Sequence, residues 1–325
     1  MRKKIVIAGG TGFIGEALIQ HFSTDNEVVV LTRGLKNEQT NSYKSNAYLN
    51  TKDNVRYVIW DATTQGPWVK ELEGAHILIN LCGKSVNCRY TTRNKREIFD
   101  SRTKPTITLG ESIHTLITPP KLWINAASAT IYRHATDGPQ DENNGEIEND
   151  FSVQVCKLWE KSFFDCRTPF TRKIALRMAV TLGRGGVMIP YLNLIKFGLG
   201  GRQGSGKQMY SWVHIEDTCR IIDWLYTQKE LEGVYNCCSP TPVNNETFMA
   251  TLRKVTQKGF GLPAYEWMLK IGAMLIGTET ELLLKSRWVL PTRLLNKGYT
   301  FMYANIEDAF TEIINNTPRK TYHLF

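Results

Sequence analysis

The first strand and the turn after it constrain the fold more than any other part of the chain. Four small apolar residues at 5–8 predict a buried parallel strand, and an apolar helix follows the turn. The turn carries three spaced glycines. We expect Gly9 to allow a tight exit from the strand, Gly12 to let a pyrophosphate approach the backbone, and Gly15 to let the helix pack on the strand.

The start of this helix predicts a dinucleotide site. Unpaired N–H groups and a partial positive charge at a helix N-terminus attract phosphate. The strand–turn–helix context is the one that such a site needs, so we favour a cofactor site over a purely structural turn. The residues assigned to it are Gly9, Gly10, Thr11, Gly12, Phe13, Ile14 and Gly15.

Length and composition set broad limits on the class of protein. The 325 residues can form a large core and two lobes, and 42% hydrophobic with 22% charged residues is typical of a globular protein. The net charge of +9 suits a phosphorylated cofactor, a nucleic acid or plain surface charge, and does not separate these alternatives.

The seven cysteines are scattered without a CxxC pair, so the sequence predicts neither a metal site nor a disulfide framework. Reduced thiols favour a cytoplasmic location. The basic residues at 2–4 precede too short an apolar run for a signal peptide, and no apolar run reaches membrane-spanning length. We therefore expect no membrane contact.

The end of the second strand, at 27–32, indicates which dinucleotide is bound. An NAD site has an acidic residue here to accept hydrogen bonds from the ribose 2′-hydroxyl, whereas this chain has Thr32 and Arg33. A guanidinium suits a 2′-phosphate, so we favour NADP, the alternative being a merely solvated Arg33. The polar stretch at 34–54 predicts a long loop near the adenosine.

The next two strands add residues to the same site. The third, at 56–60, ends in Asp61, which could accept a hydrogen bond from the adenine amine or cap a helix. The fourth, at 76–81, is apolar and therefore buried on both faces. Ligands gather at the carboxyl ends of such strands, so we assign Leu81, Cys82 and Gly83 to the cofactor.

A basic helix is predicted at 89–114, with Pro105 kinking or splitting it. No aromatic stacking platform accompanies its charges, which favours a solvated helix face over a nucleic-acid site. The fifth strand, at 122–127, leads into Ser128, whose hydroxyl could bind a substrate oxygen in the cofactor crevice. A helix at 151–164 and an apolar sixth strand at 174–182 follow.

The composition changes after the sixth strand. A glycine-rich stretch at 197–207 is interpreted as a flexible flap over the substrate, with a plain surface loop as the alternative. A lone His214 beside a helix start is more often structural than catalytic, and Glu216 or Asp217 is expected to cap that helix. The last amphipathic helix is expected at 306–314.

Alternating strands and helices predict an α/β fold, with a Rossmann-type doubly wound parallel sheet and a smaller, mainly helical C-terminal lobe. We expect residues 1–182 with 212–238 to form the NADP-binding domain. Residues 183–211 with 239–325 would form the small substrate-side domain.

Several short sequence motifs, taken together, resemble those of a known family. They are GGTGFIG at 9–15, NLCG at 80–83, SAT at 128–130 and WVHIED at 212–217. This set resembles extended short-chain dehydrogenases/reductases of the sugar-nucleotide epimerase type. Ser101-Arg102, the glycines at 198–206 and WVLPTRLL at 288–295 narrow the resemblance to the atypical branch called epimerase family proteins. The resemblance covers nearly the whole chain and implies NADP, with Glu97 and Arg102 at cofactor-contacting positions.

The chain departs from the wider family at its acid/base pair. Typical members carry a tyrosine and, four residues later, a lysine on the helix after the fifth strand. The matching positions here are Ser152 and Cys156, and neither can replace the pair. Ser128 and Cys156 are the candidate catalytic residues, and packing is the favoured role for Cys156.

Two functions from different classes remain open. The favoured one is an NADP-dependent oxidoreductase or epimerase acting on a small polar, nucleotide-sugar-like molecule. The alternative is an NADP(H)-binding sensor or scaffold without chemistry. We expect a monomer or homodimer that binds a small molecule and no nucleic acid.

Overall fold

The computed structural model describes residues 2–36, 43–44, 48–52, 54–277, 279 and 281–324. Much of the loop predicted at 34–54 therefore lies outside the described residues. Within that stretch the structure contains three short strands, which are β3 (Leu35–Lys36), β4 (Tyr43–Lys44) and β5 (Tyr48–Lys52).

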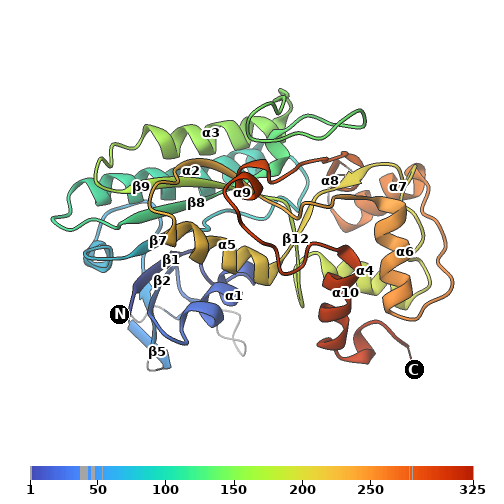
Figure 1. The fold of residues 1–325 in the computed structure, drawn as a ribbon, viewed down its shortest axis with the longest axis horizontal. Coiled ribbons are helices and arrows are strands. Elements are labelled where there is room, and N and C mark those ends of the chain that lie inside the picture. Colours follow the sequence, from blue (N-terminus) through green and yellow to red (C-terminus); the bar gives the residue numbers. More distant parts are fainter. Residues whose placement is uncertain are drawn as a thin grey trace.

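A twisted sheet of eight strands forms the centre of the larger part of the molecule (Figure 1). Its order is β13-β9-β8-β7-β1-β2-β6-β5, and only β5 at the edge runs antiparallel to its neighbour. The remaining strands of this sheet are β1 (Lys4–Ala8), β2 (Glu27–Thr32), β6 (Val55–Ile59), β7 (Ile77–Asn80), β8 (Leu122–Ser128), β9 (Arg172–Met178) and β13 (Gly233–Cys237). The seven parallel strands confirm the predicted doubly wound fold.

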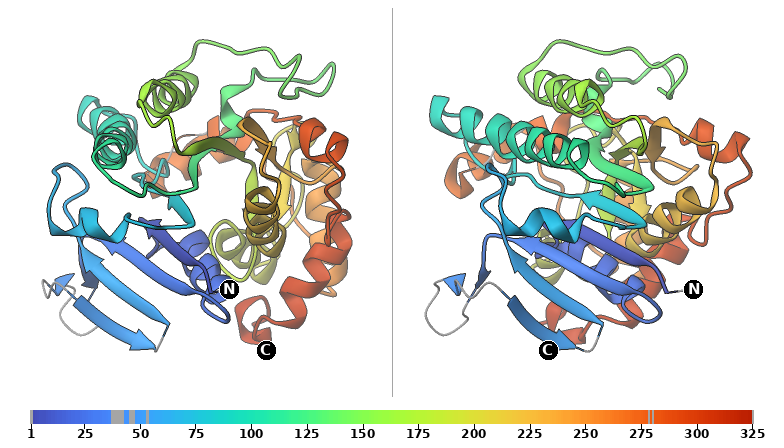
Figure 2. Two further views of the ribbon diagram at one scale, coloured as in Figure 1. Left: turned by 60° about the vertical axis from the view of Figure 1, so that its left-hand side comes forward. Right: turned by 90° about the vertical axis from the view of Figure 1, so that its left-hand side faces the viewer.

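Helices cover both faces of this sheet (Figure 2). On one face α1 packs against α5, and on the other α2 packs against α3, with the single-turn helix η1 beside them. The bounds of these helices are α1 (Phe13–Phe22), η1 (Pro67–Glu71), α2 (Thr92–His114), α3 (Phe151–Asp165) and α5 (Ile215–Thr227). Because both faces are covered, Ile5 through Ala8 of β1 and Ile77 through Ile79 of β7 are fully buried.

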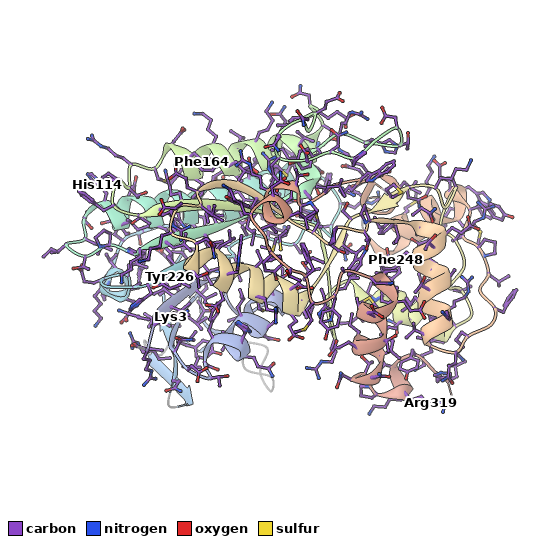
Figure 3. All side chains as sticks on the ribbon, viewed as in Figure 1. Lys3, His114, Phe164, Tyr226, Phe248 and Arg319 are labelled. Atoms are coloured by element: carbon purple, nitrogen blue, oxygen red, sulfur yellow. The ribbon has the colours of Figure 1, made fainter. Side chains whose placement is uncertain are left out.

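A second hydrophobic core lies in the C-terminal half. There Phe248 of α6 packs against Tyr191 of α4 and Phe310 of α10, with ring centroids 5.0 and 4.9 Å apart (Figure 3). The helices of this half are α4 (Met188–Lys196), α6 (Asn245–Val255), α7 (Glu266–Ile276), α8 (Glu281–Leu284), α9 (Thr292–Asn296) and α10 (Ile306–Asn315), with the short η3 (Arg319–Thr321).

Short strands join the two halves. The strand β10 (Val180–Leu182) pairs in parallel with β12 (Trp212–His214), and β11 (Met209–Tyr210) pairs antiparallel with β14 (Val243–Asn244). The backbone of Arg287 then runs along β11, since its N–H donates to the Met209 carbonyl at 2.8 Å. These contacts fix the C-terminal half against the carboxyl end of the sheet.

Three local predictions were wrong, each for a physical reason. Pro105 does not split its helix, because α2 is continuous and Thr106 Oγ1 donates to the Arg102 carbonyl at 2.7 Å beside it, while the alternative of a kink stays a prediction. The predicted sixth strand is two strands, β9 and β10, because the chain leaves the main sheet after Met178. His214, rather than an acidic residue, caps α5 by accepting from the Glu216 N–H.

Two further features differ from the sequence-based expectation. Asp217 binds backbone N–H groups near the C-terminus instead of capping α5, and the glycine-rich stretch at 197–207 is held by hydrogen bonds instead of forming a free flap. The buried Asp217 carboxylate accepts from the Met302 and Tyr303 N–H groups at 2.9 and 2.8 Å. The glycine-rich stretch is paired by backbone hydrogen bonds, among them Gly201 N–H to Leu262 O and Gly204 N–H to Ala264 O. Asp217 thus joins α5 to residues 302–303, and the glycine-rich stretch is joined to residues 262–264.

No helix within the described residues has both the length and the apolar character needed to cross a bilayer.

A buried charged network ties α3 to the sheet. Arg177 of β9 forms a two-point ion pair with Glu160 of α3, at 2.7 and 2.8 Å, and donates to the Tyr132 hydroxyl at 2.8 Å. That hydroxyl donates in turn to Asn236 Oδ1 of β13 at 3.0 Å. Both charges are almost fully buried, so removing one would leave the other uncompensated.

This network predicts a large stability difference between neighbouring substitutions on α3. Glu160→Ala should lower the free energy of unfolding by about 3–5 kcal/mol because it strands Arg177 in the interior. Lys161→Ala removes only an exposed pair with Asp165 and should cost less than about 0.5 kcal/mol. Urea unfolding followed by circular dichroism measures both, and equal losses would refute this account.

Candidate functional site

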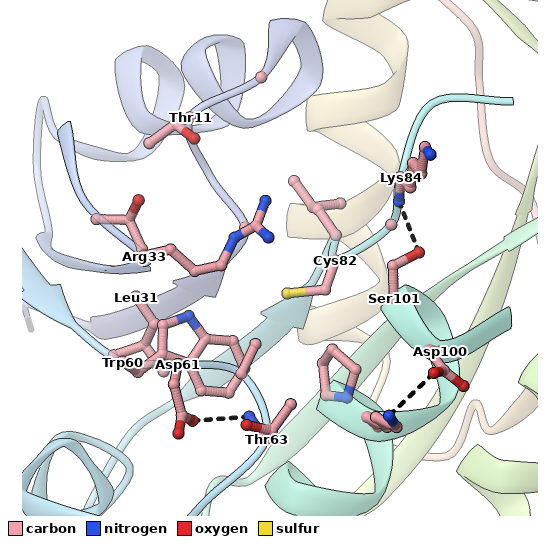
Figure 4. A pocket seen from close by; sticks show the side chains of 18 of the residues that line it. Thr11, Leu31, Arg33, Trp60, Asp61, Thr63, Cys82, Lys84, Asp100 and Ser101 are labelled. Atoms are coloured by element: carbon pink, nitrogen blue, oxygen red, sulfur yellow. Dashed lines mark hydrogen bonds and ion pairs between the residues drawn. The ribbon is translucent and has the colours of Figure 1, made fainter. Parts of the chain in front are cut away.

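A cleft of about 740 Å³ opens over the carboxyl ends of β1, β2, β6 and β7 (Figure 4). The N-terminal half of α2 forms its other wall. Ten of the residues predicted to bind the cofactor line it, namely Gly9, Thr11, Gly12, Thr32, Arg33, Asp61, Leu81, Cys82, Gly83 and Glu97. The structure thus brings together residues predicted from five separate stretches.

The floor of the cleft is a close approach between two strand ends. Gly9 has φ +76°, and a Cβ there would lie 3.0 Å from the Cys82 nitrogen and 3.1 Å from its sulfur. Asn80 holds the second strand end in place, because its Oδ1 accepts from the Cys82 N–H at 3.1 Å. Only glycine satisfies both the positive φ and the contact.

The start of α1 faces the cleft without a side-chain cap. Gly12 is the N-cap residue, and a Cβ built on it would meet no atom within 4 Å, so its free side opens to the cleft. The first N–H groups of this ten-residue helix therefore suit a pyrophosphate. Gly15 has a different role, since a Cβ there would lie 2.3 Å from the Gly10 carbonyl oxygen.

The predicted residues Phe13, Ile14 and Gly10 do not line the cleft. The Phe13 ring packs against the turn at 183–186, and Ile14 packs on the hydrophobic core under α1. A Cβ on Gly10 would lie 3.0 Å from Ile7 and from Val30. Only the backbone of these three residues could serve a ligand.

Arg33 is exposed at the rim of the cleft, and its guanidinium lies between Thr11 and Cys82 in the view of Figure 4. Within the described part of the chain it forms no ion pair, so its charge is available. Thr32 is buried, and its hydroxyl is engaged by the backbone of Gly34 at 3.1 and 3.4 Å.

Asp61 is held in a tight turn rather than left free. Its Oδ1 accepts from the Thr63 and Thr64 N–H groups at 2.8 Å each, and its Oδ2 accepts from the Thr64 hydroxyl at 2.5 Å. These hydrogen bonds, that from the Thr64 hydroxyl first, lower the pKa of Asp61 to about 2. The capping alternative describes this geometry, and binding of the adenine amine stays a prediction.

The α2 wall carries a fixed ion pair. Glu97 accepts from Lys84 Nζ at 2.5 Å and from Arg93 Nε at 2.8 Å, and these contacts, Lys84 first, lower the pKa of Glu97 to about 2. The Lys84 N–H donates to Ser101 Oγ at 2.8 Å (Figure 4). The loop after β7 is thereby tied to the helix at the cleft edge.

Arg102 lies behind the cleft wall. A Cβ on Gly83 would stand 3.3 Å from the Arg102 Cζ, and the guanidinium stacks over the Trp159 ring at 5.1 Å. Burial lowers the pKa of Arg102, while the Cys156 thiol and the Tyr90 hydroxyl act in the opposite sense. Its charge therefore reaches beyond the cleft toward α3.

The sequence reasoning missed about half of the cleft lining. The missed residues are Leu31, Trp60, Ala62, Thr63, Lys84, Ser85, Asp100, Ser101, Lys104 and Pro105. The last four, together with Glu97, follow helical spacing on one face of α2. This periodicity could have identified the wall once the helix was placed beside the glycine turn.

The two candidate catalytic residues lie together outside the lining of the cleft. Ser128 ends β8, and its Oγ accepts from the Thr130 N–H at 3.2 Å. The Cys156 thiol on α3 interacts with this Ser128 hydroxyl. Burial first, and the nearby Glu160 carboxylate second, raise the pKa of the Cys156 thiol to about 12. A thiol with this pKa stays protonated at neutral pH, so it cannot act as a nucleophile or base there.

Alkylation should separate packed cysteines from accessible ones. At pH 8, iodoacetamide should modify Cys88, which is partly exposed in the loop after β7, and leave Cys156 unmodified, because burial suppresses its thiolate. Peptide mass mapping measures both, with urea-denatured protein as the control in which every cysteine reacts. Modification of Cys156 at the rate of Cys88 would restore a reactive role.

The sheet order, the glycine turn and the cleft at the β1–β7 switch define a dinucleotide-binding protein of the short-chain dehydrogenase/reductase type. Residues 5–153 match the NAD dependent epimerase/dehydratase family, and residues 266–313 match a domain of unknown function, DUF1731. The chain is 30% identical over 318 residues to the epimerase family protein YfhF of Bacillus subtilis, covering 98% of this chain and 99% of that protein. The chain therefore belongs to the NAD dependent epimerase/dehydratase family, within its epimerase family proteins.

Two further relatives agree with this assignment. A solved structure of human epimerase family protein SDR39U1 with NADPH matches with a TM-score of 0.81 and 26% identity, covering 97% of this chain and 100% of that one. The chloroplastic SDR39U1 homologue of Arabidopsis thaliana is 28% identical over 317 residues, covering 95% of this chain and 86% of that protein. The predicted family resemblance is confirmed.

Proposed function

We propose that the chain binds NADP(H) in the cleft and acts as an oxidoreductase or epimerase-like enzyme on a small polar molecule. The observation that carries the cofactor choice is Arg33, an exposed guanidinium without an ion-pair partner among the described residues, where an NAD site has an acid. The human relative solved with NADPH supports the same choice.

Different residues would bind different parts of the cofactor and of the substrate. The uncapped N-terminus of α1 at Gly12 would hold the pyrophosphate, and Arg33 the 2′-phosphate. Leu81 to Gly83 would carry the cofactor toward Ser128, whose hydroxyl would hold the substrate oxygen. When bound, NADPH supplies a hydride to a carbonyl carbon.

An NADP(H)-binding sensor without chemistry is the second candidate. The positions of the usual tyrosine and lysine hold Ser152 and Cys156, and the Cys156 thiol is buried and neutral at physiological pH. A protein that binds NADPH tightly and shows no turnover with any carbonyl compound would favour this function.

Arg33→Ala should separate the two dinucleotides. Loss of a charge-assisted phosphate contact should weaken NADPH binding about ten- to a hundredfold and leave NADH binding nearly unchanged. Calorimetric titration measures both affinities. Lys161→Ala, which removes one exposed positive charge on α3 outside the cleft lining, is the matched control and should change neither affinity.

Two glycine substitutions should separate binding from folding. Gly12→Ala places a Cβ in open space, so the melting temperature should stay nearly unchanged while NADPH affinity falls about tenfold or more. Gly15→Ala collides with the Gly10 carbonyl and should lower the melting temperature itself. Unchanged NADPH affinity in Gly12→Ala would contradict a pyrophosphate at this turn.

A further inference from the structure

Polar side chains from three distant segments converge at the carboxyl end of β8. We call them the Tyr90 cluster, which consists of Tyr90, Ser128, Thr130, Glu281 and Arg287. Tyr90 comes from the loop after β7, Ser128 and Thr130 follow β8, and the last two lie in and after α8. Ser128, Thr130 and Arg287 are partly exposed, whereas the Tyr90 hydroxyl oxygen and Glu281 Oε1 are buried.

The backbone and ring of Tyr90 are fixed, but its hydroxyl forms no well-aligned hydrogen bond with the described residues. Its N–H donates to Glu279 Oε1 at 2.9 Å, and its ring packs against Phe151 with centroids 4.7 Å apart. The hydroxyl oxygen is buried and no hydrogen bond of good geometry reaches it from the described residues, although the Ser152 side chain lies near enough to act on it. A buried hydroxyl without a partner is costly, and such groups in native proteins call for an explanation such as a ligand.

Arg287 brings a positive charge to the same place. Its backbone is fixed along β11, and its Nε donates to Thr130 Oγ1 at 3.2 Å, next to Ser128. Within the described ranges it forms no ion pair, although its charge acts on Tyr90 and on the Cys156 thiol. One of its terminal nitrogens also donates to the Lys285 carbonyl at 3.5 Å, and the N–H groups that are left can donate to an anionic or carbonyl oxygen.

Glu281 supplies an acceptor beside these donors. Its Oε1 is buried and has no hydrogen-bond partner in the described part of the chain. The negative charge of this carboxylate opposes the lowering of the Arg287 pKa by burial, and it adds to the raising of the Tyr90 pKa by burial. Arg102 also acts on Tyr90, and the Glu279 carboxylate at the Tyr90 backbone is already paired with Arg89. Two guanidinium groups, those of Arg102 and Arg287, are therefore close enough to the Tyr90 hydroxyl to attract a negatively charged ligand.

We propose that the Tyr90 cluster is the substrate site, where Arg287 binds an anionic oxo compound and Tyr90 replaces the missing tyrosine as the proton donor. This inference rests on the proposed NADP-dependent function. In reduction, the carbonyl carbon gains a hydride from the reduced cofactor, which is oxidised. The Tyr90 O–H bond breaks, its proton forms the new O–H bond of the substrate, and water reprotonates the phenolate beside Arg287.

The electrostatics of Tyr90 fit a donor. Burial raises the pKa of Tyr90, and the nearby Glu281 also raises it, while Ser152 and Arg287 lower it. The hydroxyl is therefore protonated at neutral pH and can give its proton to an alkoxide, which is a much stronger base. Arg287 would stabilise the phenolate that remains, as the lysine does in typical members of the wider family.

The test uses oxalate, a small dianion, as the probe and the full chain labelled with tyrosine carrying ¹³C at the ring carbon that bears the hydroxyl. Tyr90→Phe identifies the Tyr90 signal by its absence. Oxalate should shift this signal in the natural chain. Arg287→Gln should weaken oxalate binding about ten- to a hundredfold, and Arg287→Lys should weaken it less.

Arg293→Gln is the matched control, because Arg293 lies on α9 and its guanidinium contacts Val234 O instead of the cluster. It should leave the oxalate affinity unchanged. Calorimetry of oxalate with Tyr90→Phe gives a second reading, and weaker binding than in the natural chain is expected. The proposal would be overturned if oxalate left the Tyr90 signal unshifted, or if the Arg287→Gln and natural chains bound oxalate with equal affinity.

These measurements use no cofactor, so they fail or succeed independently of the NADP assignment. NADPH titration of the same variants tests that assignment separately, and Tyr90→Phe should keep its NADPH affinity. Oxalate binding with no NADPH binding would remove the enzyme function and leave an anion site. NADPH binding without oxalate binding would leave the cofactor assignment intact and reject the Tyr90 cluster as the substrate site.

Discussion

The close approach of Gly9 to the backbone of Cys82 determines where this molecule can hold a ligand. It brings the ends of β1 and β7 together at the point where the crossover helices change from one face of the sheet to the other. Asn80 fixes the second strand end by accepting from the Cys82 N–H. The cleft then opens between the uncapped start of α1 and the polar face of α2, so its position follows from the two strand ends and these two helices.

The C-terminal half completes the opposite end of the site by attaching to fixed points on the larger half. Asp217, buried at the start of α5, accepts from Met302 and Tyr303. The backbone of Arg287 pairs along β11, and the Val289 N–H donates to Ser211 Oγ at 2.7 Å. The last two hydrogen bonds fix the backbone on both sides of Arg287 to β11 and to the buried Ser211.

The sequence predicted the sheet, the turn and half of the residues that line the cleft because local patterns determine them. Apolar runs located the parallel strands, and the glycine spacing located the turn and therefore the cleft. Pairings across long sequence distances left no local signal. Arg287 acts electrostatically on Tyr90 although the two residues are far apart in the sequence, and neither belongs to a periodic pattern that could have linked them. Asp217 looked like a helix cap because its tertiary partners at 302 and 303 were not visible in one dimension.

The strand order has a consequence for the timing of assembly. The sheet is complete when β13 ends at Cys237, fifty residues before Arg287. Translation at about 5–20 residues per second would leave the dinucleotide half free to fold for several seconds before the segment at 281–287 leaves the ribosome. During that interval the nascent chain would present a formed sheet whose carboxyl end lacks the cover that the C-terminal half later supplies.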